Sequence, residues 1–202
     1  MKKIVLLFIA CLLPVASAQA HNGLTFGVAV GSAGQAYSDI YTDFAGISEV
    51  SARDSSTGFR VGIPISDFLY MEGAIYDYGE ANDDYIDNFG DIISVKLSTT
   101  SINFGLAGII PVGYAPTDFI GRIGLAAWDS EVEFRDSSLP GTVLSDKDSG
   151  VGIYLGVGAR TAITQNIKLG LEYTFFGFDT NYTNVAGDQF VDNFALTLDI
   201  GF

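Results

Sequence analysis

The sequence predicts an all-β protein, an eight-stranded antiparallel up-and-down transmembrane β-barrel, and three observations support this fold. The mean hydropathy is positive (+0.31), yet after residue 20 no apolar run approaches the about 20 residues that a membrane-spanning helix needs. Segments of about ten residues carry apolar side chains at every second position. Short turns alternate with long polar connections. A closed barrel is the remaining arrangement that pairs every backbone N–H and C=O inside a bilayer.

The alternation is clearest in three C-terminal segments. Apolar residues alternate with small or charged ones within Gly150–Thr161 and within Ile167–Phe175. The last strand, which begins at Asn193, places five apolar residues on one face: Phe194, Leu196, Leu198, Ile200 and Phe202. Because lipid-facing and lumen-facing residues alternate along a barrel strand, we expect that face to contact lipid.

Five further segments show the same period and bring the number of strands to eight: Leu24–Gly31, Gly58–Ile65, Leu69–Tyr78, Ser101–Ile110 and Phe119–Trp128. Leu69–Tyr78 alternates least well, because Tyr70 and Tyr76 fall on the same side as Glu72.

The connections predict how the barrel is oriented. Short turns lie near residues 66–68, 113–118 and 164–166, and long polar loops are expected at 32–57, 79–98, 129–149 and 179–189. Outer-membrane barrels place short turns in the periplasm and long loops outside the cell. We therefore expect the protein to lie in the outer membrane of a Gram-negative bacterium, with both of its termini in the periplasm.

The chain is strongly acidic, with 24 acidic and 10 basic residues and a net charge of −14. Most acidic residues fall in the four long loops, whereas Glu72, Glu172 and Asp199 fall on the inner faces of strands. A soluble lipocalin-like barrel is the competing fold, but it would place apolar residues inside. A chain this acidic, without a basic stripe, is not expected to bind nucleic acid.

The first twenty residues predict a cleaved signal peptide. Lys2 and Lys3 precede an apolar run, and the small residues Ala18 and Ala20 form the expected cleavage site, so the mature barrel would span residues 21–202. A membrane anchor is the alternative, but the apolar run is too short for one. Cleavage would remove Cys11, the only cysteine, and would leave the mature chain without a disulfide.

The C-terminal third resembles the transmembrane barrel of the outer-membrane protein A superfamily. The resemblance lies in residues 150–160, the turn at 164–166, Leu171-Glu172-Tyr173 and the terminal Phe202, and it extends over residues 22–202. In that family a basic residue often stands two positions before this glutamate, but in this chain the position is Gly170. The pairing of Glu172 inside the barrel therefore stays open. Because the sequence ends at Phe202, we expect no peptidoglycan-binding domain of the kind that many relatives carry, and tethering to the cell wall is not implied.

The last strand also resembles the C-terminal signal of outer-membrane barrels. This resemblance implies the barrel-assembly machinery and periplasmic chaperones as partners during biogenesis. Outer-membrane lipid and lipopolysaccharide would surround the finished barrel, which we expect to be a monomer.

The sequence indicates no catalytic, cofactor or metal site. Barrel enzymes that resemble this fold rely on a histidine as base or activator, and this chain has only His21, at the expected mature N-terminus. The glycines of residues 150–158 precede no Gly-Lys-Ser/Thr motif, so they predict no nucleotide loop. An acidic group at 83, 84, 87 and 91 matches no EF-hand spacing and predicts a solvated loop, with diffuse Mg²⁺ or Ca²⁺ bridging to lipopolysaccharide as the alternative.

A repeated spacing predicts ion pairs inside the barrel. Arg60 precedes Glu72 by twelve residues across the first short turn, and Arg160 precedes Glu172 by the same interval across the third. Parity puts each pair on the inner faces of neighbouring strands. Three further inner charges are expected: Arg122, and a Lys168–Asp199 pair near the ends of the last two strands.

Two functions follow from such a barrel. Eight strands leave an interior just wide enough to be filled by side chains, which favours a structural or surface-interaction protein for envelope integrity, adhesion or host contact. The alternative is a narrow porin-like channel for small solutes or ions, which the many inner glycines and alanines would favour.

Overall fold

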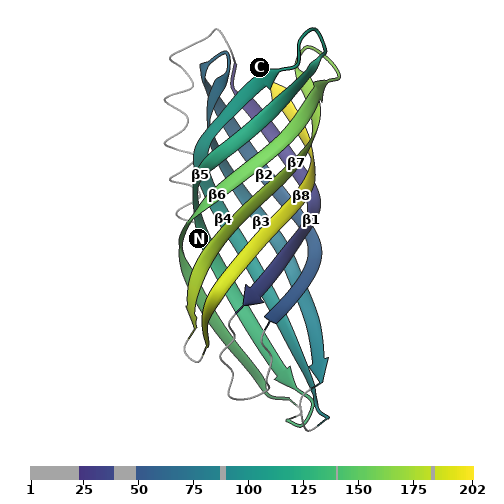
Figure 1. Cartoon of the computed structure of the whole chain (residues 1–202), viewed down its shortest axis with the longest axis vertical. Helices are drawn as coiled ribbons and strands as arrows, with labels where there is room; N and C mark the ends of the chain where they lie inside the picture. The colour runs from purple at the N-terminus through teal and green to yellow at the C-terminus, as the bar shows by residue number, and fades with distance from the viewer. Residues whose placement is uncertain (1–22, 39–48, 87–89, 140, 183–184) are drawn as a thin grey trace.

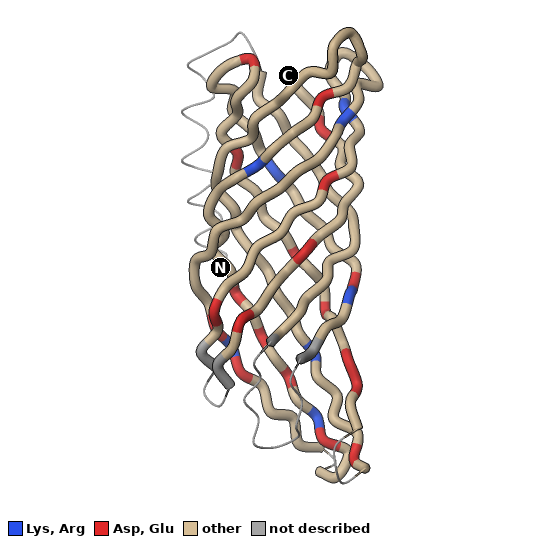
Figure 2. Tube along the Cα trace, viewed as in Figure 1, with Lys and Arg blue, Asp and Glu red and all other residues tan. Residues whose placement is uncertain are grey.

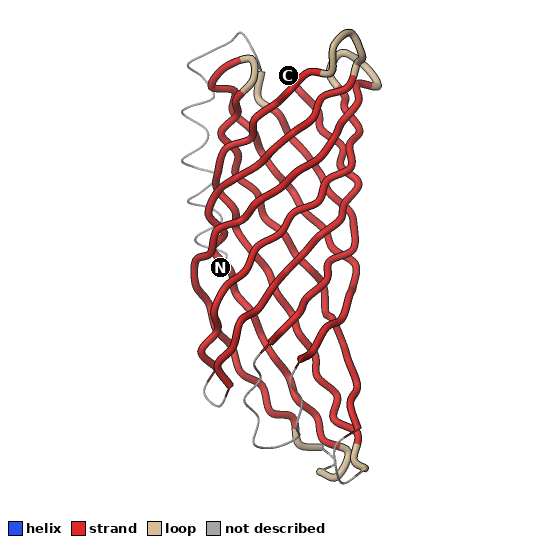
Figure 3. The backbone as a smooth tube through the Cα atoms, viewed as in Figure 1, coloured by secondary structure: helices blue, strands red, loops and turns tan. Residues whose placement is uncertain are grey.

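The computed structural model describes residues 23–38, 49–86, 90–139, 141–182 and 185–202, and nearly all of them lie in strands (Figures 1 and 3). The eight strands are β1 Thr25–Ser38, β2 Glu49–Ser66, β3 Leu69–Ile86, β4 Ile92–Pro111, β5 Thr117–Asp136, β6 Val143–Ala162, β7 Ile167–Tyr182 and β8 Val185–Gly201. Each pairs antiparallel with the next, and β8 pairs with β1 to close the barrel. Among the described residues, no helix is long and apolar enough to cross a membrane. The predicted eight-stranded antiparallel barrel is therefore confirmed.

The strands are longer than predicted, at 14 to 20 residues each. Much of the sequence expected to form loops at 32–57, 79–98, 129–149 and 179–189 continues as strand toward one end of the barrel. We call this the loop end, and the opposite end, which carries the short turns and the C-terminus, the turn end; in Figure 1 the turn end is at the top. The acidic residues gather toward the loop end (Figure 2).

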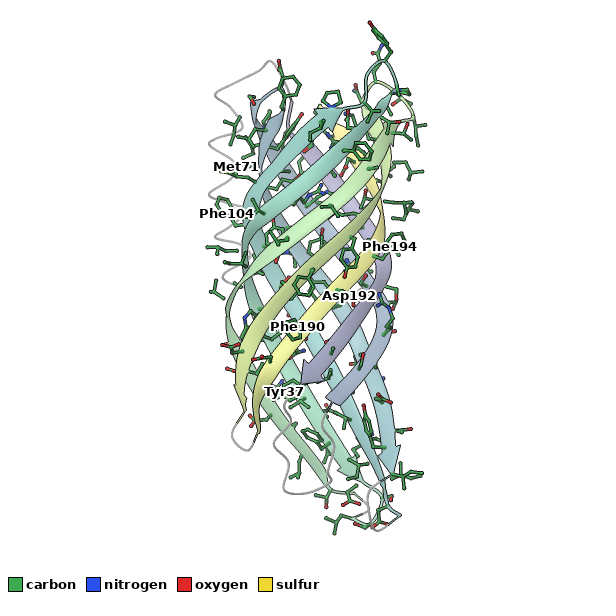
Figure 4. All side chains as sticks on the ribbon, in the orientation of Figure 1. Tyr37, Met71, Phe104, Phe190, Asp192 and Phe194 are labelled. Carbon is green, nitrogen blue, oxygen red and sulfur yellow. The ribbon has the colours of Figure 1, made fainter. Side chains whose placement is uncertain are left out.

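The loop-end extension was missed because its alternation is inverted. Near the turn end the apolar side chains point outward, as Phe104 of β4 and Phe194 of β8 do in Figure 4. At the loop end the polar side chains point outward and Val95, Leu97 and Val132 are buried inside. A search for apolar residues on the outer face therefore stops where the outer face becomes polar.

The barrel wall divides in two at the loop end. The β2–β3 ladder stops at Thr57↔Asp77, and the β6–β7 ladder stops at Ile153↔Gly177. Beyond these points β3 to β6 continue as one four-stranded sheet, which we call the projecting sheet, while β7, β8, β1 and β2 continue as another. The projecting sheet extends farthest from the turn end (Figure 1).

Side chains close the gap between β2 and β3. The Gln35 amide donates to the carbonyl oxygens of Tyr78 (3.3 Å) and Gly79 (3.2 Å). The Glu80 backbone N–H donates to Asp54 Oδ2 at 2.8 Å. The irregularity between Asp77 and Glu80 depends on Gly79, whose φ is +75°.

Gly79→Ala tests this closure. An alanine there is strained at positive φ, and its Cβ would also collide with the carbonyl oxygen of Ser55. We expect a loss of about 2–4 kcal/mol in the free energy of unfolding. The matched control is Gly90→Ala, which has a φ of +89° and open space around the new Cβ, and should cost about 1–2 kcal/mol. Urea unfolding of both variants in detergent micelles measures the difference, and equal losses would contradict the collision.

Candidate functional site: a chain of charges in the lumen

Two arginines and two glutamates meet at the centre of the lumen. Arg122 contacts Glu72 (Nε–Oε2, 2.6 Å) and Glu172 (Nη1–Oε2, 2.6 Å). Arg60 reaches the same oxygen of Glu172 with its Nη1 at 2.7 Å. One carboxylate oxygen therefore accepts hydrogen bonds from two guanidinium groups, on strands β2 and β5, that would otherwise repel each other.

The contacts continue toward the turn end. Arg60 donates to Asp199 from Nε and Nη2, at 3.0 and 2.9 Å to Oδ1. Arg160 lies between Asp199 (Nη1–Oδ2, 3.6 Å) and Asp118 (Nε–Oδ2, 3.4 Å). Lys168 Nζ then contacts Asp118 Oδ2 at 2.6 Å.

These contacts join eight side chains of alternating sign, which we call the charge chain: Glu72, Arg122, Glu172, Arg60, Asp199, Arg160, Asp118 and Lys168. It holds four acids and four bases and is neutral overall. Only 3% of the Arg122 side chain is exposed, against 34% of Lys168 at the turn end. The contacts are therefore desolvated at the centre and hydrated at the mouth.

A glycine on β1 gives Arg60 room to reach Asp199. Gly27 is in register with Arg60 on one side and Asp199 on the other, so the guanidinium crosses β1 above it. A Cβ at residue 27 would lie 2.6 Å from Arg60 Nε and would collide with Asp199 Oδ1. The first strand thus takes part in the charge chain by carrying no side chain at this position.

The structure places all seven predicted lumen charges inside the barrel but pairs them differently. The expected Arg60–Glu72 and Arg160–Glu172 pairs are replaced by Arg122–Glu72 and by contacts of Glu172 with Arg60 and Arg122. The twelve-residue spacing places each predicted pair two positions out of register: Arg60 lies opposite Ala74, and Glu72 opposite Gly62. Such diagonal neighbours are about 7–8 Å apart, and the long arginines find closer carboxylates across the lumen.

The predicted Lys168–Asp199 pair is also replaced, because Lys168 contacts Asp118 instead. Sequence reasoning missed Asp118 by assigning it to a short turn. Asp118 shares the inward parity of Arg122 on β5 and lies in register with Arg160 on β6. That parity is the signal that could have identified it.

A layer of aromatic rings lies on the loop side of the charge chain. Tyr76 stacks on Tyr78 (5.7 Å between ring centroids), Tyr78 contacts Phe176 (5.4 Å), and Phe176 stacks on Phe178 (5.3 Å). Trp128 completes the series by stacking on Phe178 at 4.0 Å. These residues are all buried. The layer therefore adds a second set of buried side chains to the lumen, next to the charge chain.

A polar layer follows the aromatic one. The Thr99 hydroxyl donates to Gln35 (2.8 Å) and lies 3.1 Å from the Ser130 hydroxyl. Ser130 donates to Gln189 Oε1 at 3.0 Å, and Gln189 Nε2 donates back to Thr99 at 3.0 Å. Tyr37, which is labelled near the loop end in Figure 4, belongs to an apolar cluster beyond this layer.

Two groups of predicted residues remain, the cleavage site and the assembly signal. Ala18 and Ala20 lie outside the described residues. Phe194, Leu196, Leu198 and Ile200 face outward on β8, while Phe202 packs edge-on against Phe26 with the ring centroids 5.7 Å apart. In the described part of the chain, no group of His, Cys, Asp and Glu side chains is arranged to hold a metal ion.

Two double-mutant cycles distinguish the observed pairing from the predicted one. Arg122→Ala leaves the buried Glu72 without a partner, and Glu172→Ala removes the carboxylate that separates Arg60 from Arg122, so each should cost about 3–5 kcal/mol. Their coupling should exceed about 1 kcal/mol, whereas Arg160→Ala with Glu172→Ala should be additive within about 0.5 kcal/mol. Urea unfolding in detergent measures both cycles. A larger coupling in the second cycle would restore the predicted pairs.

Comparison with solved structures identifies the fold. The chain is similar to Neisserial surface protein A (14% identity, 89% of this chain and 99% of that chain, TM-score 0.54). It is similar to the outer membrane protein OprG from Pseudomonas aeruginosa (12% identity, 90% and 97%, TM-score 0.53). The outer membrane protease OmpT from Escherichia coli is similar too (11% identity, 92% and 100%, TM-score 0.53).

No curated protein sequence matches the chain. The family model of the outer membrane protein beta-barrel domain, in contrast, matches residues 8–202, which is nearly the whole sequence. The antiparallel closed barrel, its apolar outer face and its polar lumen are what that domain requires in a bilayer. The chain therefore belongs to the outer membrane protein beta-barrel domain family.

Proposed function

We propose that this protein is a closed structural and surface-interaction barrel of the outer membrane. The observation that carries the proposal is the occupied lumen, in which the neutral charge chain is followed by a buried aromatic layer. Eight-stranded barrels have interiors just wide enough for such filling.

The exposed loop end supports a role at the cell surface. We propose that the turn end faces the periplasm, as in other outer-membrane barrels, so that the projecting sheet extends outward. Its outer face carries Lys96, Glu131 and Glu133 beside a buried apolar interior, which suits water rather than lipid. A stiff, acidic sheet in this place supports adhesion, host contact or interaction with neighbouring envelope components.

A narrow channel is the second candidate. The observation in its favour is a cavity at each end: one of about 340 Å³ near Tyr70 and Lys168 at the turn end, and one of about 400 Å³ near Trp128 toward the loop end. The first cavity is lined by Arg160, Lys168 and Asp199 of the charge chain, and the second by Trp128 and Phe178 of the aromatic layer. Conduction would require both layers to move aside.

We infer that the barrel has no catalytic activity. One barrel of similar fold is a protease, so the fold alone does not decide the question. The chain contains a single histidine, His21, which precedes the first strand, and the lumen carboxylates are engaged in ion pairs. A general base positioned beside a nucleophile is therefore missing from the described lumen.

Planar-bilayer recording tests the closed lumen. The unaltered protein should give no steady channels, because ions meet two packed layers. Arg122→Ala with Glu172→Ala opens the first layer and should add brief openings. The matched control, Arg53→Ala with Asp192→Ala, removes an ion pair (3.0 Å) from the outer face and should stay silent. Steady, resolvable channels in the unaltered protein would favour the channel.

We also propose that the last strand is the signal read by the barrel-assembly machinery. Deleting Phe202 should slow insertion and leave precursor with periplasmic chaperones. Phe26→Ala is the control, because it removes the ring that Phe202 packs against and leaves the C-terminus intact. The fraction of heat-modifiable, folded protein is followed after pulse labelling of cells. Equal slowing in both variants would show that packing, and not recognition of the C-terminus, is responsible.

A further inference from the structure

A cavity at the turn end of the barrel is lined by one end of the charge chain. Its volume is about 340 Å³, which lies near the lower limit of the about 300–1,000 Å³ that small-molecule sites occupy. The charged residues in its lining are Arg160 of β6, Lys168 of β7 and Asp199 of β8. We call this cavity the mouth pocket. It lies at the end of the barrel that is at the top in Figure 1.

The mouth pocket contains a buried cation that makes few hydrogen bonds. Only 8% of Arg160 is exposed. Its Nε donates to Asp118 Oδ2 at 3.4 Å, and its Nη1 lies 3.6 Å from Asp199 Oδ2, which is too long for a hydrogen bond. Among the described residues, neither Nη atom of Arg160 has a hydrogen-bond acceptor. Because a guanidinium carries five N–H donors, most of this hydrogen-bonding capacity remains for water or a ligand.

Arg160 is left in this state because other cations hold both of its acidic neighbours more closely. Asp199 accepts hydrogen bonds from Arg60 at 2.9, 3.0 and 3.1 Å. Asp118 Oδ2 lies 2.6 Å from Lys168 Nζ. The charge chain also ends with a base at the turn end, whereas its opposite end, at the centre of the lumen, is a glutamate. The order of signs therefore places the positive end of the charge chain at the mouth pocket.

Neutral donors lie beside these bases. Tyr70 of β3 and the side-chain amides of Gln165 and Asn166, in the turn between β6 and β7, line the same cavity. The acidic side chain in the lining, Asp199, is engaged by Arg60 through both of its oxygens. A ligand with several oxygen acceptors would therefore find charged and neutral donors around it.

We propose that the mouth pocket binds a phosphate group, which accepts hydrogen bonds from the Nη atoms of Arg160 and from Lys168 Nζ. The planar fork of a guanidinium matches two phosphate oxygens, and an ammonium adds a point charge to a third. The phosphate is either the free anion or the headgroup of a phospholipid. The site needs a folded barrel but not a closed lumen, so channel recordings and phosphate binding fail independently.

The net charge of the protein makes specific binding of an anion easy to recognise. At −14 the chain repels anions overall. Without a site, phosphate and chloride would act alike, by screening the charges of the protein. A saturable response to phosphate at constant ionic strength therefore requires donors that are gathered in one place.

The test follows the Arg160 Nε–H signal by NMR, in protein that is labelled with ¹⁵N-arginine and folded in maltoside micelles, which contain no phosphate. Arg160→Lys identifies the signal by its disappearance. One arm titrates sodium phosphate, and the other mixes dilauroyl phosphatidylethanolamine into the micelles, both at an ionic strength held constant with sodium chloride. We expect a saturable shift of this signal. A shift with sodium phosphate alone identifies the free anion as the ligand, and a shift with the lipid identifies the headgroup.

A steric variant separates the mouth pocket from general attraction. Gly201 lines the pocket, and a Cβ there would lie 4.0 Å from the nearest atoms, so a side chain fits into the cavity. Gly201→Val should weaken binding at least about tenfold without changing any charge, because it takes up the space of the ligand. Gly121→Val is the matched control: its Cβ would lie in open space, and affinity should change less than about twofold.

A second variant tests the guanidinium itself. Arg160→Lys keeps the charge but loses the fork, and it should weaken binding about tenfold. Arg53→Lys makes the same exchange at an exposed ion pair with Asp192 and should leave the affinity unchanged. Phosphorus NMR of the added phosphate or lipid measures the affinities of all variants. Each variant is first checked for heat-modifiable migration of the folded barrel.

Three results would overturn the proposal. The Arg160 signal might be unmoved in both arms, which would show that the free donors are satisfied by water alone. An equal shift on adding sodium chloride would reduce the effect to screening. Unchanged affinity in Gly201→Val would place the phosphate outside the mouth pocket.

Discussion

Every charge that a barrel strand turns into a narrow lumen has to meet an opposite charge there, because desolvation of an unpaired ion costs several kcal/mol. This constraint organises the interior. Arg60 and Arg122 approach each other only because Glu172 lies between them, and Asp199 joins Arg60 to the more hydrated residues at the turn end. The order of signs along the charge chain thus follows from the need of each member to have a neighbour of opposite sign.

Along a single strand, side chains alternate with the same two-residue period where the outer face contacts lipid and where it contacts water. Within the apolar band, β4 exposes Phe104 and Leu106 and buries Asn103. Nearer the loop end it buries Val95 and Leu97 and turns Lys96 outward. The alternation of side chains continues unchanged, but the apolar residues pass from the outer face to the inner face and the polar residues pass to the outer face. The barrel can therefore extend beyond the bilayer as a continuous sheet with its own apolar interior.

The number of strands, their antiparallel order and the outward faces could be predicted because a bilayer imposes one simple rule on the sequence. The lengths of the strands could not, since beyond the bilayer that rule is reversed. Parity identified the inward charges, but their partners depend on three-dimensional reach across the lumen. The Arg60–Asp199 contact needs Gly27 between them, and a single glycine gives no such signal in a sequence. The division of the barrel wall was also unpredictable, because it depends on where the β2–β3 and β6–β7 ladders end.

The neutrality of the charge chain bears on how the barrel responds to an electric field. A single elementary charge moved through 100 mV gains about 2.3 kcal/mol, which is how voltage drives charged segments across membranes. Four positive and four negative groups that are held together by short contacts carry no net charge, so a field along the barrel axis does no net work when they shift as a unit. It can only polarise them. As long as these contacts hold, the charge chain offers a field no net charge to move.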